Sequence, residues 1–139
     1  MQPQVVWRGS IPVVERPAPQ SSDTPVVLVV TNDGDLREVS ARVLGREGYM
    51  ALTAAHAGHA LLACLKAGHI DVLVAELSMD DVSGPALAAR LQRHNPEMAT
   101  VYVASAGTPE CEGVLVRPFT RDDLLTAVAV RLAASAVTA

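Results

Sequence analysis

The run Val26-Val27-Leu28-Val29-Val30 decides the fold, because five consecutive aliphatic residues are typical of a strand buried on both faces of a sheet. Directly after it, apolar residues recur at helical spacing (Leu36, Val39, Val43, Leu44). Asp35 with Glu38 three residues later resembles a capping box at the start of this helix. The stretch therefore predicts a buried strand followed by a helix.

The same alternation continues along the chain. Further strands are predicted at residues 49–53, 71–76, 99–104 and 113–116. Helices are predicted around Leu61–Leu65 and around Pro85–Leu91, and Thr120 caps a last helix that carries Leu124, Val128 and Leu132. Alternating strands and helices predict an α/β fold with an open parallel sheet covered on both faces.

The connection between the last two predicted strands departs from this alternation. Residues 106–112 hold Gly107 and Pro109 and show no helical period, so the fourth helix is missing. A chain of that length spans about 23 Å, enough to return along a strand of about 17–20 Å. A parallel last strand is thus predicted, with an antiparallel one as the alternative, because parallel crossovers ordinarily need a dozen or more residues.

Composition bounds the class of protein. The chain has 139 residues, the length of one domain, and a net charge of −4, which argues against nucleic-acid binding. Two cysteines are too few for a disulfide framework. The longest aliphatic run is too short to cross a membrane, which needs about 20 residues, and no signal peptide is recognisable. We therefore expect a soluble cytoplasmic protein.

Prolines mark the domain boundary, since five of the nine lie in the first 25 residues. We expect an N-terminal extension and linker at 1–25, a domain at 26–134 and a tail at 135–139. The extension is unusually apolar at Val5-Val6-Trp7 and at residues 11–14. These segments are interpreted as a short strand, as a docking element or as a disordered extension. Either the docking element or a second subunit would cover the sheet face left bare by the missing helix.

Ligands of open α/β sheets bind beyond the carboxyl ends of the strands. That rule selects candidate site residues by position alone. They are Thr31, Asn32 and Asp33 after the first strand, Glu76 after the third, Ser105 after the fourth and Arg117 after the fifth.

Four motifs in this order are similar to the receiver (CheY-like response-regulator) domain of bacterial two-component signalling. They are residues 29–38, 46–49, 71–84 and 113–120, within a match that spans about 26–134. The resemblance implies a flavodoxin-like, doubly wound sheet of five parallel strands in the order 2-1-3-4-5. The sequence of residues 117–125 is most similar to that of receivers attached to hybrid histidine kinases.

The same resemblance assigns roles to positions, and at most of them this chain departs from the family. Thr31 and Asn32 stand where the family has two acidic ligands of Mg²⁺, Glu76 replaces the phosphorylated aspartate, and Arg117 replaces the lysine. Ser105 keeps the hydroxyl that follows the phosphoryl group. Val114 stands at the position of the switch aromatic.

These departures predict a degenerate receiver without Mg²⁺ or another cofactor, which acts by contact with a histidine kinase or an output domain, or as a homodimer, and is not an enzyme. The alternative is a working phosphoacceptor that uses Glu76 or Asp33 with a divalent cation held by Asp33, Glu76 and Asp80. Glu76 itself has two interpretations, a standing mimic of the phosphorylated state or an ion-pair partner of Arg117, and the pair is favoured because a guanidinium can grip a carboxylate with two bonds.

Overall fold

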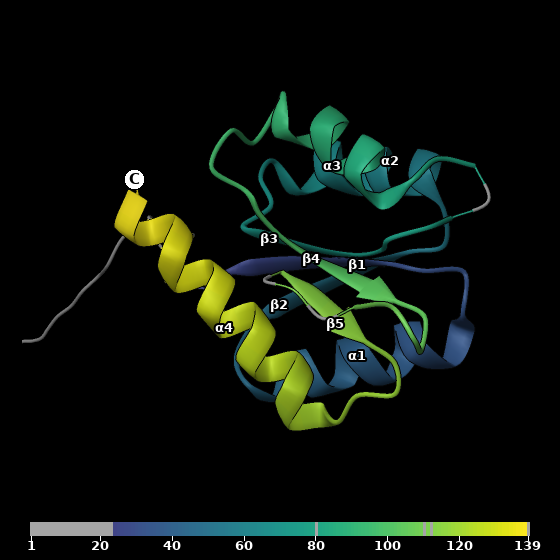
Figure 1. The fold of residues 1–139 in the computed structure, drawn as a ribbon. Helices are drawn as coiled ribbons and strands as arrows, with labels where there is room; N and C mark the ends of the chain where they lie inside the picture. The colour runs from purple at the N-terminus through teal and green to yellow at the C-terminus, as the bar shows by residue number, and fades with distance from the viewer. Residues whose placement is uncertain (1–23, 80, 110, 112, 139) are drawn as a thin grey trace, which may run out of the picture.

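A computed structural model describes residues 24–138 except 80, 110 and 112, with side chains described up to residue 134. Five parallel strands form one sheet in the order β2-β1-β3-β4-β5 (Figure 1). The strands are β1 (Val26–Val30), β2 (Met50–Ala54), β3 (Val72–Glu76), β4 (Ala99–Ala104) and β5 (Val114–Val116). The helices are α1 (Gly34–Arg46), α2 (Ala57–Ala67), α3 (Gly84–Gln92) and α4 (Arg121–Thr138).

Helices cover both faces of the sheet, α2 and α3 on one and α1 and α4 on the other (Figure 1). The central strand β1 is buried along its whole length, as its aliphatic run predicts. Its alternate side chains divide between two cores, since Leu28 packs toward α2 and α3 and Val27 toward α1 and α4. The predicted fold class and strand order are confirmed.

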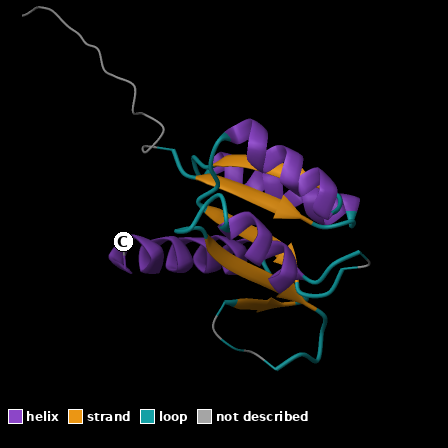
Figure 2. Cartoon of the chain, turned by 90° about the horizontal axis from the view of Figure 1, so that it is seen from above, coloured by secondary structure: helices purple, strands orange, loops and turns teal. Residues whose placement is uncertain are grey.

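Strand β5 runs parallel to β4, with Tyr102 opposite Val114 and Ala104 opposite Val116. The antiparallel alternative is therefore wrong. The described residues between the two strands form turns and loop rather than a helix (Figure 2). Because β5 is parallel to β4, the residue after β5, Arg117, arrives at the same sheet edge as Glu76.

Capping differs from the sequence prediction at one helix. The N-cap of α1 is Asp33, whose side chain accepts hydrogen bonds from the backbone N–H groups of Asp35 and Leu36. The capping box predicted at Asp35 is wrong, because the helix already begins at Gly34. The cap predicted at Thr120 is confirmed, and Thr120 and Asp123 exchange side-chain-to-backbone hydrogen bonds of 3.0 and 3.1 Å, which form a capping box.

The side chains of Tyr102, Val114 and Val116 share the face of the sheet that carries α2 and α3, and each is partly exposed. The described residues between β4 and β5 form no helix that would cover this face. The apolar segments at 5–7 and 11–14, predicted to dock there, lie outside the described residues. Within the described residues, none of the helices is long and apolar enough to cross a membrane.

Candidate functional site

The carboxyl ends of the strands open into a cleft of about 660 Å³. Of the six residues selected by position, four line the cleft: Asn32, Glu76, Ser105 and Arg117. Ala55, His56, Ser78, Met79 and Asp81 complete the lining. The topological rule therefore found the right end of the sheet, and the remaining lining residues come from the loops before α2 and α3.

Glu76 is the centre of the site. It is the last residue of β3, and its side chain is only 14% exposed. Its Oε2 atom accepts a hydrogen bond of 2.6 Å from the Thr31 hydroxyl. The same oxygen forms an ion pair with the Arg117 guanidinium. The acceptor position is therefore engaged from two sides.

Thr31 is almost fully buried, with 1% of its surface exposed. Besides donating to Glu76, its Oγ1 atom accepts from the backbone N–H of Asp33 at 3.1 Å. The Arg37 side chain of α1 donates to the carbonyl oxygen of Thr31 at 2.8 Å. A hydroxyl that both donates and accepts thus ties the β1–α1 loop to the end of β3. The sequence placed Thr31 at this edge but gave it no role beyond replacing an acid.

Arg117 reaches Glu76 from the end of the edge strand β5, across the end of β4. Its backbone N–H donates to the carbonyl oxygen of Ala104 at 2.9 Å, which fixes the residue at the end of β5. The peptide bond to Pro118 is cis. The side chain, 36% exposed, extends past β4 to the end of β3. The ion pair expected between Glu76 and Arg117 is present in the structure, and it follows from the parallel direction of β5.

Two further side chains, those of Asp81 and His56, lie on the far wall of the cleft. Asp81 accepts from the backbone N–H of Ala57 at 3.1 Å, and this hydrogen bond is the main cause of its lowered pKa. His56 is the N-cap of α2, and its Nδ1 accepts from the backbone N–H of His59 at 3.2 Å.

Gly84 lets the start of α3 pack against the end of β3. A Cβ atom at this position would lie 2.3 Å from the carbonyl oxygen of Glu76 and 3.0 Å from the Tyr102 ring. The Gly84 backbone N–H donates to the carbonyl oxygen of Leu77 at 3.0 Å. Because only a glycine fits this contact, Gly84 sets the position of the strand end that carries Glu76.

The remaining predicted site residues are separated. Asn32 and Ser105 are exposed at the cleft. Val114 does not line the cleft, since it lies one strand length from the mouth on the face shared with Tyr102. Asp33 lies outside the cleft as the N-cap of α1. Asp80, the third candidate cation ligand, lies outside the described residues.

The carboxylates that the structure describes at this edge have protein partners, whereas Mg²⁺ takes near-octahedral oxygen ligands that usually include carboxylates. Glu76 is paired with Arg117, Asp81 caps α2 and Asp33 caps α1. Thr31 and Asn32 bring neutral groups where two charges would be needed. Among the residues that the structure describes, no group of three His, Cys, Asp or Glu side chains is placed to hold a metal ion.

Comparison with known proteins gives a consistent answer about the family. Residues 27–129 match the response regulator receiver domain. No curated protein sequence matches the chain significantly. Among solved structures, a response regulator receiver domain protein from Clostridium thermocellum is 19% identical with a TM-score of 0.70, over 83% of this chain and 99% of that one.

Two other structures of this kind are similar over most of their length. The chemotaxis response regulator CheY4 of Vibrio cholerae is 24% identical with a TM-score of 0.67, over 77% of this chain and 98% of that one. The receiver domain of the hybrid histidine kinase CckA is 27% identical with a TM-score of 0.67, over the same shares of the two chains, 77% and 98%. With the family match over most of the chain and the fold in agreement, the protein belongs to the receiver domains of two-component signalling.

Proposed function

We propose that this protein is a degenerate receiver, which takes part in two-component signalling by protein contact and does not accept a phosphoryl group. The observation that carries this proposal is the double engagement of one carboxylate oxygen. Glu76 Oε2 receives both the Thr31 hydroxyl and the Arg117 guanidinium. In-line phosphoryl transfer needs an accurately placed nucleophile beside a metal ion, and here Thr31 and Arg117 fix the orientation of the carboxylate; misplacement by about 1 Å can cost 10²-fold in rate.

The electrostatics of the cleft support the same conclusion. A metal ion neutralises the charge that develops during phosphoryl transfer. Here Thr31 and Asn32 are neutral, and the one carboxylate at the centre is already balanced by Arg117. We infer that the site binds Mg²⁺ weakly or not at all and that the protein does not catalyse its own phosphorylation.

The ion pair also favours a single conformation of the signalling edge. Glu76 joins the ends of β1, β3 and β5 through Thr31 and Arg117. A partner would therefore meet a surface whose shape does not depend on a phosphodonor. Receiver domains generally interact with kinases or output domains, so a histidine kinase or an output domain is the proposed partner. The similarity to the CckA receiver supports a place among receivers of hybrid histidine kinases. The alternative to contact with such a partner is a homodimer.

The test is exposure of the purified chain to acetyl phosphate with Mg²⁺, followed by intact-protein mass spectrometry. We expect the unmodified mass throughout, while a receiver with an aspartate acceptor and two acidic ligands, treated in parallel, gains one phosphoryl group. A stoichiometric, hydroxylamine-sensitive adduct that requires Mg²⁺ would overturn the proposal. Mapping the adduct to Glu76 or to Asp33 would then establish the working phosphoacceptor instead.

A further inference from the structure

Helix α2 is apolar on the side that faces solvent as well as on the side that faces the sheet. Its buried residues are small, namely Ala57, Ala60 and Cys64. Its large apolar residues lie outside, since Leu62 is 57% and Leu65 is 65% exposed. A helix at the surface of a soluble protein ordinarily has a polar outer face, and one that is apolar all round is ordinarily buried. The outer side of α2 therefore has the composition of a covered surface.

The leucines of α2 form one continuous stripe. Leu65 is four residues from Leu61 and three from Leu62, the two spacings that make side chains neighbours on a helix. Leu61 is partly buried against the core between the sheet and α2 and α3, and the other two extend this apolar surface outward. Figure 1 shows α2 and α3 as the outer layer on their side of the sheet. Single exposed leucines are ordinary, whereas a contiguous group marks an interaction site.

The charges of α2 and α3 are few and lie at one end. Lys66 and Arg90 are the only Lys, Arg, Asp or Glu residues in the two helices, and each stands in the last turn of its helix. Both helices return from the carboxyl ends to the amino ends of parallel strands, so these last turns lie at the same end. The other end is acidic, because the exposed Asp81 accepts a hydrogen bond from the Ala57 N–H at the start of α2.

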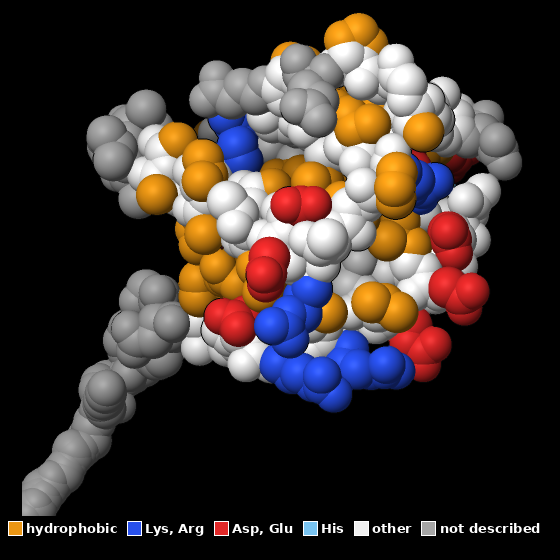
Figure 3. All heavy atoms as spheres, turned by 60° about the horizontal axis from the view of Figure 1, so that its bottom comes forward, with side chains coloured by type: hydrophobic (Ala, Val, Ile, Leu, Met, Phe, Trp, Pro, Cys, Tyr) orange, Lys and Arg blue, Asp and Glu red, His pale blue; other side chains and the backbone are white. Residues whose placement is uncertain are grey.

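The opposite side of the sheet has a different surface. Figure 3 shows charged side chains of both signs among the apolar ones on the side that carries α1 and α4. Helix α1 alone includes Asp35, Arg37, Glu38, Arg42 and Arg46. The core of a protein interface is depleted of charged residues. The surface of α2 and α3 has that composition, and the surface of α1 does not.

We propose that a second copy of this chain covers α2 and α3, with the two α2 helices antiparallel about a two-fold axis near Leu62. A two-fold interface pairs a surface with itself, and this symmetry is the commonest among oligomers. Along the helix, Lys66 lies about 6 Å from Leu62 in one direction and Ala57 about 7.5 Å in the other. Antiparallel pairing therefore places Lys66 opposite the start of the second α2 helix, beside Asp81 of the partner subunit.

The charge pattern is the reason for choosing a second copy as the occupant. A partner whose contact surface carries charge of one sign would meet one end of this surface favourably and the other unfavourably. A copy turned by 180° meets both ends favourably and presents its own uncharged leucines to the middle. The inference goes beyond the proposed function, since self-association of this surface does not depend on whether Glu76 accepts a phosphoryl group.

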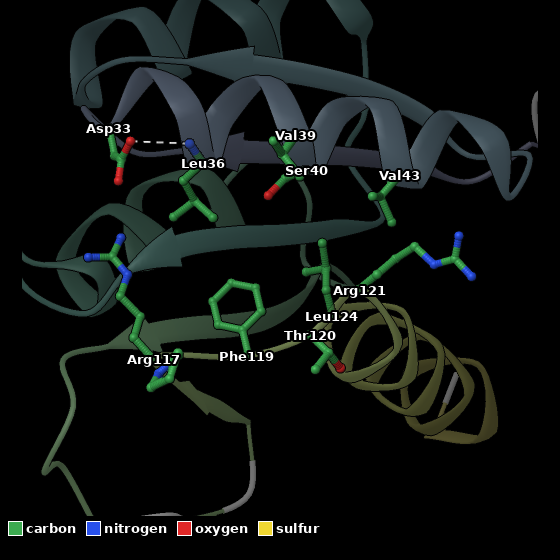
Figure 4. A pocket seen from close by; sticks show the side chains of 11 residues that line it. Asp33, Leu36, Val39, Ser40, Val43, Arg117, Phe119, Thr120, Arg121 and Leu124 are labelled. Carbon is green, nitrogen blue, oxygen red and sulfur yellow. Dashed lines mark hydrogen bonds between the residues drawn. The ribbon is translucent and has the colours of Figure 1, made fainter.

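The experiment measures the mass of the full chain in solution by sedimentation velocity, at protein concentrations from micromolar to millimolar. We expect the mass to rise from 14.6 kDa toward that of two copies. Leu62→Arg should raise the dissociation constant by about tenfold or more. Val39→Arg is the matched control, because Val39 is a 51% exposed apolar residue of α1 on the other side of the sheet, at the groove shown in Figure 4. Far-ultraviolet circular dichroism checks that both variants are folded.

The antiparallel arrangement has its own test. Lys66→Gln removes the attraction to Asp81 of the partner subunit and Lys66→Glu replaces it with repulsion, so the dissociation constant should rise in that order. Arg42→Glu on α1 should leave it unchanged. A K66E protein that associates as tightly as wild type would overturn the proposed pairing.

Two further outcomes would contradict the interface itself. A chain that stays monomeric at every concentration would overturn the proposal, and so would equal weakening by L62R and V39R. A monomeric chain in which L62R lowers the Tm and V39R does not would assign the surface of α2 to a segment of the same chain, which also overturns association between copies.

Discussion

Arg117 and Thr31 bind the same oxygen of Glu76, one from the end of β5 and the other from the end of β1. The resemblance to receiver domains assigns these three residues to the positions expected to hold the lysine, one metal ligand and the phosphorylated aspartate. In this chain they bond to one another. The negative charge of the Glu76 carboxylate is balanced by the Arg117 guanidinium rather than by a metal ion. The arrangement therefore links three strand ends within the protein.

The first prediction concerns the ion pair. In a double-mutant cycle with Glu76→Gln and Arg117→Gln, we expect a coupling energy of about 1–2 kcal/mol, between the values for exposed and fully buried pairs. Its size follows from exposures of 14% for Glu76 and 36% for Arg117. Urea denaturation of the four proteins measures it. A coupling energy of zero would mean that the contact contributes nothing to the free energy of unfolding.

The second prediction concerns the Thr31 hydroxyl. Thr31→Val keeps the shape of the side chain but removes the donor to Glu76 and the acceptor for the Asp33 N–H. We expect a loss of about 1–3 kcal/mol in the free energy of unfolding, since the largely buried Glu76 carboxylate loses a hydrogen-bond donor. Thr31→Ser keeps the hydroxyl and should be milder. If Thr31→Ser is as destabilising as Thr31→Val, packing of the methyl group accounts for the effect.

Much of the fold could be predicted from the sequence because its determinants are local. The run at 26–30 forms β1 within the predicted bounds, and Pro85 lies in the first turn of α3 as expected. The direction of β5 could not be settled, because it depends on how residues 105–113 return along the sheet. The position of the α1 N-cap was predicted two residues late, since Asp33 and Asp35 are both suitable caps and only the start of the helix distinguishes them.

The candidate site was predictable in its position and only partly in its contacts. Parallel strands bring their carboxyl ends together, so the edge that holds Glu76 and Arg117 follows from element order. The hydrogen bond from Thr31 to Glu76 and the cap from Asp81 to α2 depend on side-chain packing between loops 24 or more residues apart.

The third prediction tests the contact between Gly84 and the end of β3. Gly84→Ala places a Cβ atom 2.3 Å from the Glu76 carbonyl oxygen, so α3 or β3 must shift. We expect a loss of about 1–3 kcal/mol, as for other overpacked positions. Gly45→Ala is the control, because a Cβ there has no neighbour within 4 Å and alanine favours the helix by about 0.5–1 kcal/mol. Thermal unfolding of both variants gives the comparison, and a Gly84→Ala protein as stable as wild type would refute the steric argument.

The fourth prediction is a pH dependence that comes from Asp81. The hydrogen bond from the Ala57 N–H lowers its pKa below 3.8, so its stabilising contribution is complete above that value and is lost as the pH falls through the lower, folded-state pKa. The stability difference between wild type and Asp81→Asn should therefore shrink on going from about pH 7 to about pH 3. Urea midpoints at the two pH values measure it. Asp122→Asn, at a side chain 84% exposed, is the control. A difference that stays constant would show that the carboxylate charge at Asp81 is unimportant.

The last prediction is that receiver chemistry can be restored by replacing the engaged side chains. The variant Thr31→Asp, Asn32→Asp, Glu76→Asp and Arg117→Lys removes the ion pair and supplies three carboxylates at one sheet edge, the ligand type that Mg²⁺ prefers. Without Mg²⁺ these charges repel, so we expect a lower Tm than wild type, and added Mg²⁺ should raise it by binding the folded state. Intact-protein mass spectrometry after acetyl phosphate should then show one phosphoryl group, and the same variant with Asn at position 76 should show none. A folded variant whose Tm rises with Mg²⁺ but which gains no phosphoryl group would contradict the claim that these four positions account for the loss. It would direct attention to Val114 and to the connection between β4 and β5, where the chain also departs from its family.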